Sequence, residues 1–325
     1  MIITRTPLRI SFAGGGTDLP SYYRHHGGGA VTSAAIDRYI HVLVSTKFDH
    51  TIRAAYSHTE NVEHLDQLQH GLIREAMRRT GVTGGVEVHT VADIPSEGTG
   101  LGSSSTLTVG LLQALYAYRG ILKDPADLAR EACEIEIDRL KGTLGKQDQY
   151  IAAFGGVQYF EFHPDDSVRS APIPISAEDR DAMGAHLSLF YTGQTRKAQG
   201  LLESQSARTQ QNIPSLDRLR ELAGDARDAI AHAQWKRLGE VLDEGWQLKR
   251  GLSDGITSSA IDELYDRAKA AGAYGGKIAG AGGGGFLLLV HPPERTHQIE
   301  ETLSPRQRTP VRISAEGSRI LFVGR

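Results

Sequence analysis

The sequence contains a single cysteine and no long apolar run. Because Cys133 is the only cysteine among 325 residues, an intramolecular disulfide is excluded. Apolar residues nowhere approach the roughly 18 in succession that a membrane-spanning helix needs, so we expect no membrane partner. The stretch from Met1 to Arg5 has no long apolar segment after its charge, and we do not expect a signal peptide there. These absences favour a cytoplasmic protein.

A surplus of positive charge is also missing. Lysine and arginine number 36 against 39 acidic residues, which gives a net charge of −3. Proteins that bind nucleic acid usually carry a basic surplus, so we expect no nucleic-acid partner. A few local cations can still hold one phosphate group, so a phosphorylated small molecule stays open as a substrate.

Glycine, by contrast, is abundant, with 37 residues that cluster rather than spread. The clusters lie at 14–16, 98–102 and 280–285, and they mark places where the backbone must approach something closely. The chain is too long for one ordinary core. Because the segment 163–185 is rich in Asp, Pro and Ser, we place a boundary there and expect domains at 1–175 and 176–325.

The pattern of apolar residues predicts strands and helices in both halves. Expected strands cover 1–12, 40–45, 86–91, 157–162, 187–191, 286–290, 311–313 and 320–323. Expected helices cover 57–80, 106–118, 124–140, 214–234, 235–250 and 258–271. A glycine-punctuated stretch without an expected element lies at 141–156. This mixture predicts an α+β protein of two domains with a cleft between them.

A glycine- and serine-rich loop runs directly into the expected helix 106–118. It consists of Gly98, Thr99, Gly100, Leu101, Gly102, Ser103, Ser104 and Ser105. Backbone N–H groups can surround a phosphate only where side chains do not intervene, and a helix start adds unpaired N–H groups. The loop is not a Walker motif, because no Gly-Lys-Ser/Thr ends it. The loop therefore predicts a phosphate site, with a flexible turn as the alternative.

Four stretches of the chain resemble the motifs of the GHMP kinases, a family of small-molecule kinases. They are Pro7 to Asp18, Gly98 to Ser105, Gly145 to Gln149, and Lys277 to Phe286. They follow the family's order and span nearly the whole chain. The resemblance implies ATP and Mg²⁺ as cofactors. It also implies a first domain like ribosomal protein S-five domain two and a ferredoxin-like second domain.

Within the family, the first motif is most similar to that of the heptose-phosphate and fucose kinases. The resemblance implies an ATP-dependent sugar-phosphate kinase. Its expected acceptor is the C1 hydroxyl of D-glycero-D-manno-heptose 7-phosphate, and the 1,7-bisphosphate formed would serve nucleotide-heptose synthesis. Gly15 and Gly16 stand where galactokinase-like members have Glu and His, which argues against galactose.

The resemblance also implies roles for single residues. Asp148 matches the catalytic aspartate, which takes the proton of the acceptor hydroxyl or orients it, and Arg9 matches the basic residue that offsets charge beside it. Ser104 and Glu136 match the magnesium ligands. Expected substrate contacts are Gly14, Gly15, Gly16, Thr17, Asp18, Lys146, Gln149, Arg196, Gly282 and Gly283.

A substrate that carries its own phosphate needs a second cationic site. We expect Arg196 or Lys197, which follow a strand, to contact that phosphate, with a solvated basic loop as an equal alternative. Glu97 is an extra residue before the phosphate loop, and we expect its carboxylate to point away from a triphosphate.

Other functions stay open on the sequence alone. One alternative is a fucose kinase or another small-molecule kinase of the same family. Another is a catalytically inactive sugar or nucleotide sensor on the same fold, against which the presence of Arg9, Ser104 and Asp148 argues. The acceptor sugar, the anomer and the assembly are undecided, and a homodimer is one alternative.

Overall fold

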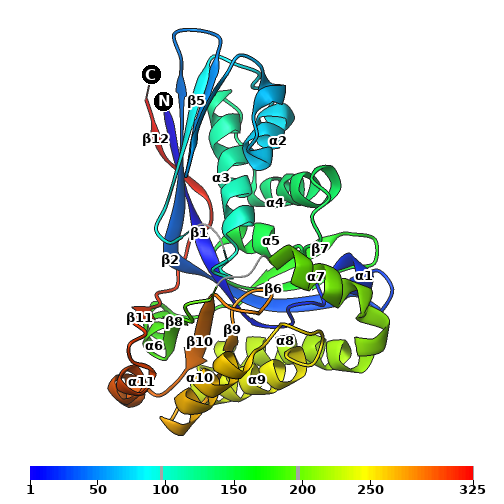
Figure 1. The fold of residues 1–325 in the computed structure, drawn as a ribbon, viewed down its shortest axis with the longest axis vertical. Helices are drawn as coiled ribbons and strands as arrows, with labels where there is room; N and C mark the ends of the chain where they lie inside the picture. The colour runs from blue at the N-terminus through cyan, green and yellow to red at the C-terminus, as the bar shows by residue number, and fades with distance from the viewer. Residues whose placement is uncertain (96–97, 195–197, 325) are drawn as a thin grey trace.

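Two β-sheets organise the chain, a larger one in the upper part of Figure 1 and a smaller one in the lower part. The computed structural model describes residues 1–95, 98–194 and 198–324. Within these residues, eight strands form the larger sheet in the order β12-β1-β2-β5-β3-β4, with β6 pairing with β2 and β7. Four strands form the smaller sheet in the order β11-β8-β10-β9.

The strands of the larger sheet are β1 (Ile2–Ala13), β2 (Gly29–Thr46), β3 (Ile52–Ala55), β4 (Thr59–Val62), β5 (Val86–Ala92), β6 (Val157–Phe162), β7 (Val168–Pro172) and β12 (Arg319–Val323). Those of the smaller sheet are β8 (Leu187–Tyr191), β9 (Gly275–Ile278), β10 (Phe286–Val290) and β11 (Arg308–Pro310). The two ends of the chain meet, because the amino group of Met1 donates to the carbonyl of Gly324 at 2.7 Å (Figure 1).

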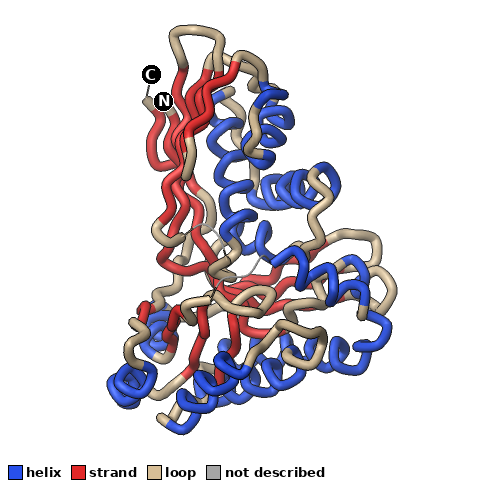
Figure 2. Tube along the Cα trace, viewed as in Figure 1, coloured by secondary structure: helices blue, strands red, loops and turns tan. Residues whose placement is uncertain are grey.

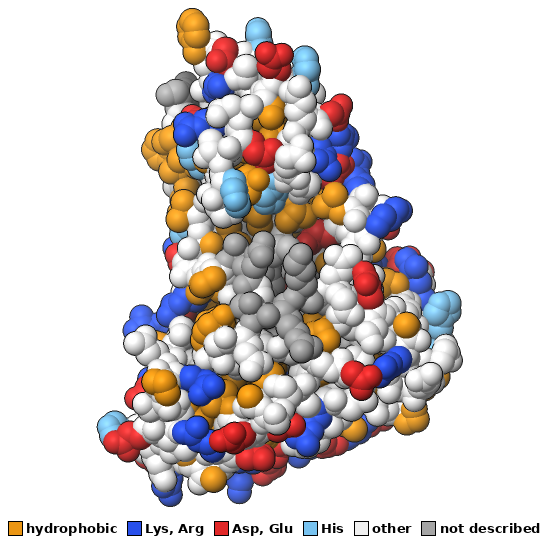
Figure 3. Space-filling model, viewed as in Figure 1, with side chains coloured by type: hydrophobic (Ala, Val, Ile, Leu, Met, Phe, Trp, Pro, Cys, Tyr) orange, Lys and Arg blue, Asp and Glu red, His pale blue; other side chains and the backbone are white. Residues whose placement is uncertain are grey.

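The helices are α1 (Pro20–Tyr23), α2 (Gly71–Thr80), α3 (Ser103–Tyr118), α4 (Pro125–Cys133), α5 (Gln147–Phe154), α6 (Ala177–Ala185), α7 (Ala198–Ala207), α8 (Ile213–Ala231), α9 (Trp235–Lys249), α10 (Ser259–Ala270) and α11 (Thr296–Leu303). Figure 2 shows helices gathered on one face of the larger sheet, with a second group below it. No helix of the described residues is long and apolar enough to cross a membrane. On the face drawn in Figure 3, acidic and basic side chains are interspersed.

Helix α3 fixes the phosphate loop against strand β1. The helix is buried along most of its length, because it lies between the larger sheet and helices α2, α4 and α5. Its approach to the sheet is close at Gly110, where an added Cβ would lie 2.8 Å from the hydroxyl of Thr6. At the start of the helix, the N–H of Arg9 donates to the carbonyl of Leu101 at 3.1 Å. The loop and the strand therefore hold each other in place.

The structure confirms most of the elements expected from the sequence and corrects several. The stretch 57–80 is not one helix: it contains β4 and a short 3₁₀ turn at Leu65–Gln67 before α2, which Gly81 ends as expected. The expected helix 124–140 changes at Glu134 into a π-helix that ends at Arg139. The expected strand at 311–313 is wrong: β11 ends at Pro310, and Ile313 forms only an isolated bridge to Ile36.

Several short elements were missed. Helix α5 lies inside the glycine-punctuated stretch 141–156, and it is buried on nearly all sides, so it lacks the polar face that marks an amphipathic helix. The expected linker 163–185 contains β7 and α6. Helices α7 and α11 and strand β9 were also not anticipated. The boundary near 175 stays a prediction, and strand β12 returns from the second half to pair with β1.

Candidate active site

A cavity of about 700 Å³, here called the central cavity, is lined by residues from both halves of the chain. The expected site residues that line it are Arg9, Gly15, Gly16, Asp18, Gly98, Thr99, Gly100, Gly102, Ser103, Ser104, Ser105, Asp148 and Gly282. Those that do not are Gly14, Thr17, Leu101, Glu136, Lys146, Gln149 and Gly283. Arg196, Lys197 and Glu97 lie outside the described residues. All four stretches of the resemblance thus contribute to one cavity.

Arg9 and Asp148, which both line the central cavity, form an ion pair. The guanidinium of Arg9, on β1, donates from Nε and Nη2 to the two carboxylate oxygens of Asp148 at 2.7 and 2.6 Å. Its remaining nitrogen, Nη1, donates to the carbonyl of Gly100 at 2.5 Å. The Arg9 side chain is 5% exposed and that of Asp148 is 21% exposed, so the carboxylate is the more open of the two groups. A two-pronged contact of this kind sets the orientation of the carboxylate as well as its position.

The phosphate loop packs against the glycine-rich segment that follows β9. Gly100 has a φ of +75°, and an added Cβ would lie 2.3 Å from the carbonyl oxygen of Ala279. Gly102 has a φ of +79°, and a Cβ there would lie 3.2 Å from a carboxylate oxygen of Asp148. Glycine is therefore required at both positions by backbone conformation and by space. The N-terminus of α3 consequently opens onto the cavity without intervening side chains.

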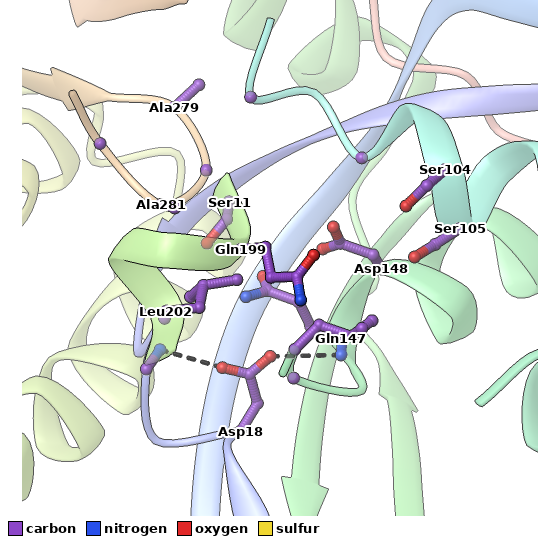
Figure 4. Close-up of a pocket in the computed structure, with 18 of the residues that line it drawn as sticks. Ser11, Asp18, Ser104, Ser105, Gln147, Asp148, Gln199, Leu202, Ala279 and Ala281 are labelled. Carbon is purple, nitrogen blue, oxygen red and sulfur yellow. Dashed lines mark hydrogen bonds between the residues drawn. The ribbon is translucent and has the colours of Figure 1, made fainter. Parts of the chain in front are cut away.

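Asp18 marks the other end of the cavity. Its carboxylate accepts from the N–H of Gly16 at 2.9 Å and from the N–H of Gln147 at 3.3 Å (Figure 4). The residue is 3% exposed, and burial raises the pKa of its carboxyl, which the hydrogen bond from Gly16 opposes. Gly145 leaves the room for this arrangement, since a Cβ there would lie 1.9 Å from the carboxylate. Asp18 is thus held between the first motif and the loop that leads into α5.

Models of both domains of one protein family match the chain. The model for the GHMP kinases N terminal domain matches residues 68–156, and that for the GHMP kinases C terminal domain matches residues 226–306. Together the two matches cover more than half of the chain. The chain belongs to the GHMP kinase family. The expected two-domain α+β fold of that family is confirmed, and the chain is an ATP-dependent phosphotransferase.

Three similar proteins have names that describe kinases of sugars or sugar phosphates. A D-glycero-alpha-D-manno-heptose 7-phosphate kinase from Campylobacter jejuni is 29% identical, over 94% of each chain. The L-fucokinase/L-fucose-1-P guanylyltransferase of Bacteroides fragilis is 27% identical over 94% of this chain and 36% of its own length. A solved structure, described as a D-glycero-D-manno-heptose 1-phosphate kinase from Bacteroides thetaiotaomicron, is 26% identical and superposes over the full length of both chains with a TM-score of 0.83.

Thr17, Lys146 and Gly283 were expected to contact the substrate, but they do not line the cavity of this GHMP kinase. Each of them instead binds other residues of the chain. The hydroxyl of Thr17 donates to the carbonyls of Gly14 and Ala30, at 2.8 and 2.9 Å, and closes the turn of the first motif. The ammonium of Lys146 donates to Asp166 at 3.1 Å and lies 5.0 Å from the centre of the Tyr23 ring. The N–H of Gly283 donates to the carbonyl of Ile256 at 2.8 Å.

Glu136 and Gln149 form a buried pair beneath the start of α3. The amide nitrogen of Gln149 donates to Glu136 at 2.6 Å, and Glu136 is 4% exposed. Burial raises the pKa of the Glu136 carboxyl to about 7, while the hydroxyls of Ser105 and Ser104 act in the opposite direction. A buried carboxylate beside serine hydroxyls supplies the hard oxygen donors that Mg²⁺ prefers. The donor set therefore fits the expected metal.

Several residues on the cavity wall were not anticipated. They include Ser11, Gln147, Gln199, Leu202, Gln205 and Lys249. Figure 4 shows Gln199 and Leu202 reaching the cavity from α7, opposite Asp148. The hydroxyl of Ser11 and the amide nitrogen of Gln205 are buried, with no hydrogen-bond partner among the described residues. Ser11 lies within the first motif, which could have suggested it, but no local pattern marks α7 or Lys249.

Proposed function

We propose that this GHMP kinase transfers the γ-phosphoryl group of ATP to the anomeric C1 hydroxyl of D-glycero-D-manno-heptose 7-phosphate. The product would be the 1,7-bisphosphate. The observation that carries the proposal is the Asp148 carboxylate, held by Arg9 and facing a cavity that it shares with the phosphate loop and Asp18. The relatives named as heptose phosphate kinases support the sugar phosphate as acceptor class.

The nucleotide's phosphates would lie against the loop 98–105, where backbone N–H groups and the start of α3 favour negative charge. In phosphoryl transfer the protein contributes mainly alignment and charge stabilisation. Asp148 would accept the proton of the attacking hydroxyl or hold that hydroxyl in line. Arg9 would keep the carboxylate in place and add positive charge next to Gly100.

The acceptor sugar would lie between Asp148 and Asp18. A carboxylate can accept from two adjacent hydroxyl groups, which suits a sugar ring. Gly15 and Gly16 line this part of the cavity without side chains and so leave room for the ring. The volume of about 700 Å³ falls within the range of roughly 300–1,000 Å³ that small-molecule sites usually have.

Mg²⁺ would be held by Ser104 and Glu136. When bound, the ion neutralises charge on the nucleotide's phosphates. Magnesium keeps several of its waters, so two protein ligands suffice.

A panel of acceptors with ATP and magnesium, read as ADP release, tests the proposal. The panel should contain heptose 7-phosphate, heptose 1-phosphate, fucose and mevalonate, because the relatives' names differ in the acceptor. We expect the highest kcat/KM with heptose 7-phosphate, and phosphorus NMR of the product should show the new phosphate at C1. A preference for fucose or mevalonate would overturn the proposed acceptor. ADP release with none of the four would favour the sensor.

Three further features of the chain are open to test. Arg196 or Lys197 contacts the acceptor phosphate, which an unchanged KM for heptose 7-phosphate in Arg196→Ala would contradict. The domains divide near residue 175, which limited proteolysis can test. A homodimer is one alternative for the assembly, which sedimentation can test.

A further inference from the structure

Two buried lysines approach the central cavity from the second half of the chain. Lys249 is the last residue of α9 and lines the cavity, and Lys277 lies on β9, against which α9 packs. Their residues are 6% and 5% exposed. A buried lysine is rare unless its charge is compensated. Neither lysine has a role in the function proposed above, so both need a physical reason for being there.

The described residues supply little compensation for these charges. The ammonium of Lys249 donates to the carbonyl oxygen of Gly280 at 2.5 Å, and that oxygen carries no formal charge. Among residues 1–95, 98–194 and 198–324, no carboxylate forms an ion pair with Lys249 or Lys277. Buried charges without a partner are costly, so the arrangement favours an anion in the cavity.

The nearby acids are already engaged. Asp148 is bound by Arg9 through both oxygens, and Asp18 accepts backbone hydrogen bonds from Gly16 and Gln147. Of the described residues that line the cavity, the cations are Arg9 and Lys249 and the acids are Asp18 and Asp148, and Arg9 is paired with Asp148. Because Asp18 forms no ion pair with Lys249, a phosphate group of a ligand would supply the counter-charge of the ammonium.

Lys249 lies near both ends of the cavity, because Gly280, which accepts its hydrogen bond, packs against Gly100 of the phosphate loop. The cations among the described lining residues are Arg9 and Lys249, and Arg9 is already bound to Asp148. Because the nucleotide's phosphates have the backbone N–H groups of the loop 98–105, Lys249 is the cation left for a phosphate on the acceptor. Gln205 lies at the acceptor end of the cavity, because its amide nitrogen would be 2.3 Å from a Cβ added at Gly16. That nitrogen and the hydroxyl of Ser11 are buried and have no hydrogen-bond partner among the described residues, as expected of groups that bind sugar hydroxyls when the acceptor is present.

We propose that Lys249, with Lys277 behind it, binds the phosphate group that the acceptor sugar already carries. This inference rests on the proposed function and names, among the described residues, a cation that would distinguish a sugar phosphate from a free sugar. A bound phosphate also bears on whether the two lysines are protonated. Burial lowers the pKa of Lys249 to about 8, and burial together with the charge of Lys249 lowers the pKa of Lys277. A bound phosphate would favour the charged forms of both.

Kinetics of Lys249→Met test the inference, with heptose 7-phosphate and unphosphorylated heptose as alternative acceptors. Methionine keeps the unbranched apolar stem and removes the charge. We expect KM for heptose 7-phosphate to rise about 10- to 100-fold, the usual range for a lost charge-assisted hydrogen bond. KM for ATP and the rate with unphosphorylated heptose should change by less than about threefold. Lys277→Met should shift the same constant in the same direction by a smaller factor.

Lys236→Met is the matched control, because Lys236 is exposed on the same helix and far in sequence from the cavity lining. It should leave all constants unchanged. Thermal melting of each variant shows whether it is folded. The Kd of the wild-type protein for each sugar gives a test without substitution. With a non-hydrolysable ATP analogue at saturation, the protein should bind heptose 7-phosphate at least about tenfold more tightly than heptose.

Each other outcome overturns the inference. An equal fall of kcat with both acceptors, or a raised KM for ATP, would place Lys249 on the transferring phosphoryl group instead. An unchanged preference for the phosphorylated sugar in folded Lys249→Met would remove Lys249 as the recognising cation while leaving the proposed function intact. Wild-type protein that uses no sugar phosphate would overturn both proposals at once.

Discussion

The two ends of the central cavity are built from different materials. The nucleotide end is backbone: a loop of glycines and serines before α3, packed on a second glycine-rich segment. The acceptor end is made of side chains from β1, α5, α7 and α9, which lie far apart in the sequence. The comparison teaches that a site made of consecutive backbone groups leaves a local signature in the sequence, whereas single side chains from separate helices, such as Gln205 and Lys249, do not. The predictions below test how far the two ends can be disturbed separately.

The largest effect is expected at Asp148, which lies between the two ends. Asp148→Asn removes the negative charge that accepts or orients the hydroxyl proton, so kcat should fall about 10²- to 10⁴-fold. Binding of ATP and of acceptor, measured by calorimetry, should change little. Asp138→Asn, on the exposed side of the π-helix, is the control and should behave as wild type. A variant that loses ATP affinity instead would show that Asp148 serves the nucleotide end.

The nucleotide end alone should respond to Gly100→Ala. The new Cβ would collide with the carbonyl of Ala279 and displace the loop, so the Kd for ATP should rise about tenfold or more. Gly120→Ala is a matched control, because Gly120 has nearly the same φ, +73°, and open space around it. Both variants should lose about 1 kcal/mol of stability from backbone strain, to which the collision adds a further loss in Gly100→Ala, but only Gly100→Ala should lose nucleotide affinity. If Gly100→Ala and Gly120→Ala bound ATP equally well, the loop 98–105 would not be the site of the nucleotide's phosphates.

The acceptor end should respond to pH through Lys249. Its pKa is lowered to about 8, so the ammonium is present below that pH and is lost as the pH rises through it. The Kd for heptose 7-phosphate should therefore be about tenfold weaker at pH 9 than at pH 7, where the sugar phosphate itself is already ionised. Calorimetry across this range checks the slope, and Lys249→Met should flatten it. A slope that persists in the variant would assign the titration to another group.

The smallest effect is expected at Ser11. Ser11→Ala removes a buried hydroxyl without a partner, so stability should stay level or rise, while the Kd for the acceptor weakens about three- to tenfold. Ser170→Ala supplies the contrast, since that hydroxyl donates to Gln158 at 3.0 Å outside the cavity. It should lower the melting temperature and leave acceptor binding unchanged. The opposite pattern would mean that Ser11 serves the fold rather than the acceptor.

The fold was predictable wherever an element had a local pattern. Strand β5 alternates, α2 has a periodic apolar face with Gly81 as its stop, and α3 follows a glycine loop. Helix α5 was not predicted from the sequence, because burial on nearly all sides removes the polar face of an amphipathic helix. Strand β9 was not predicted because it is short and begins with two glycines. The same limit applies to the site, where Asp148 was recognised by its motif while its helix was not.

The sequence by itself determined the family, the phosphate loop and the stretches that bear Arg9, Asp18 and Asp148, because glycine spacing and short motifs record what the backbone must do locally. Only the tertiary structure decided that Lys249 and Gln205 reach the same cavity. It also decided that Thr17 and Lys146 form their hydrogen bonds with other residues of the chain, outside the cavity lining. The physical reason is that side chains from distant elements meet through the packing of helices on sheets, and that packing depends on contacts over the whole chain.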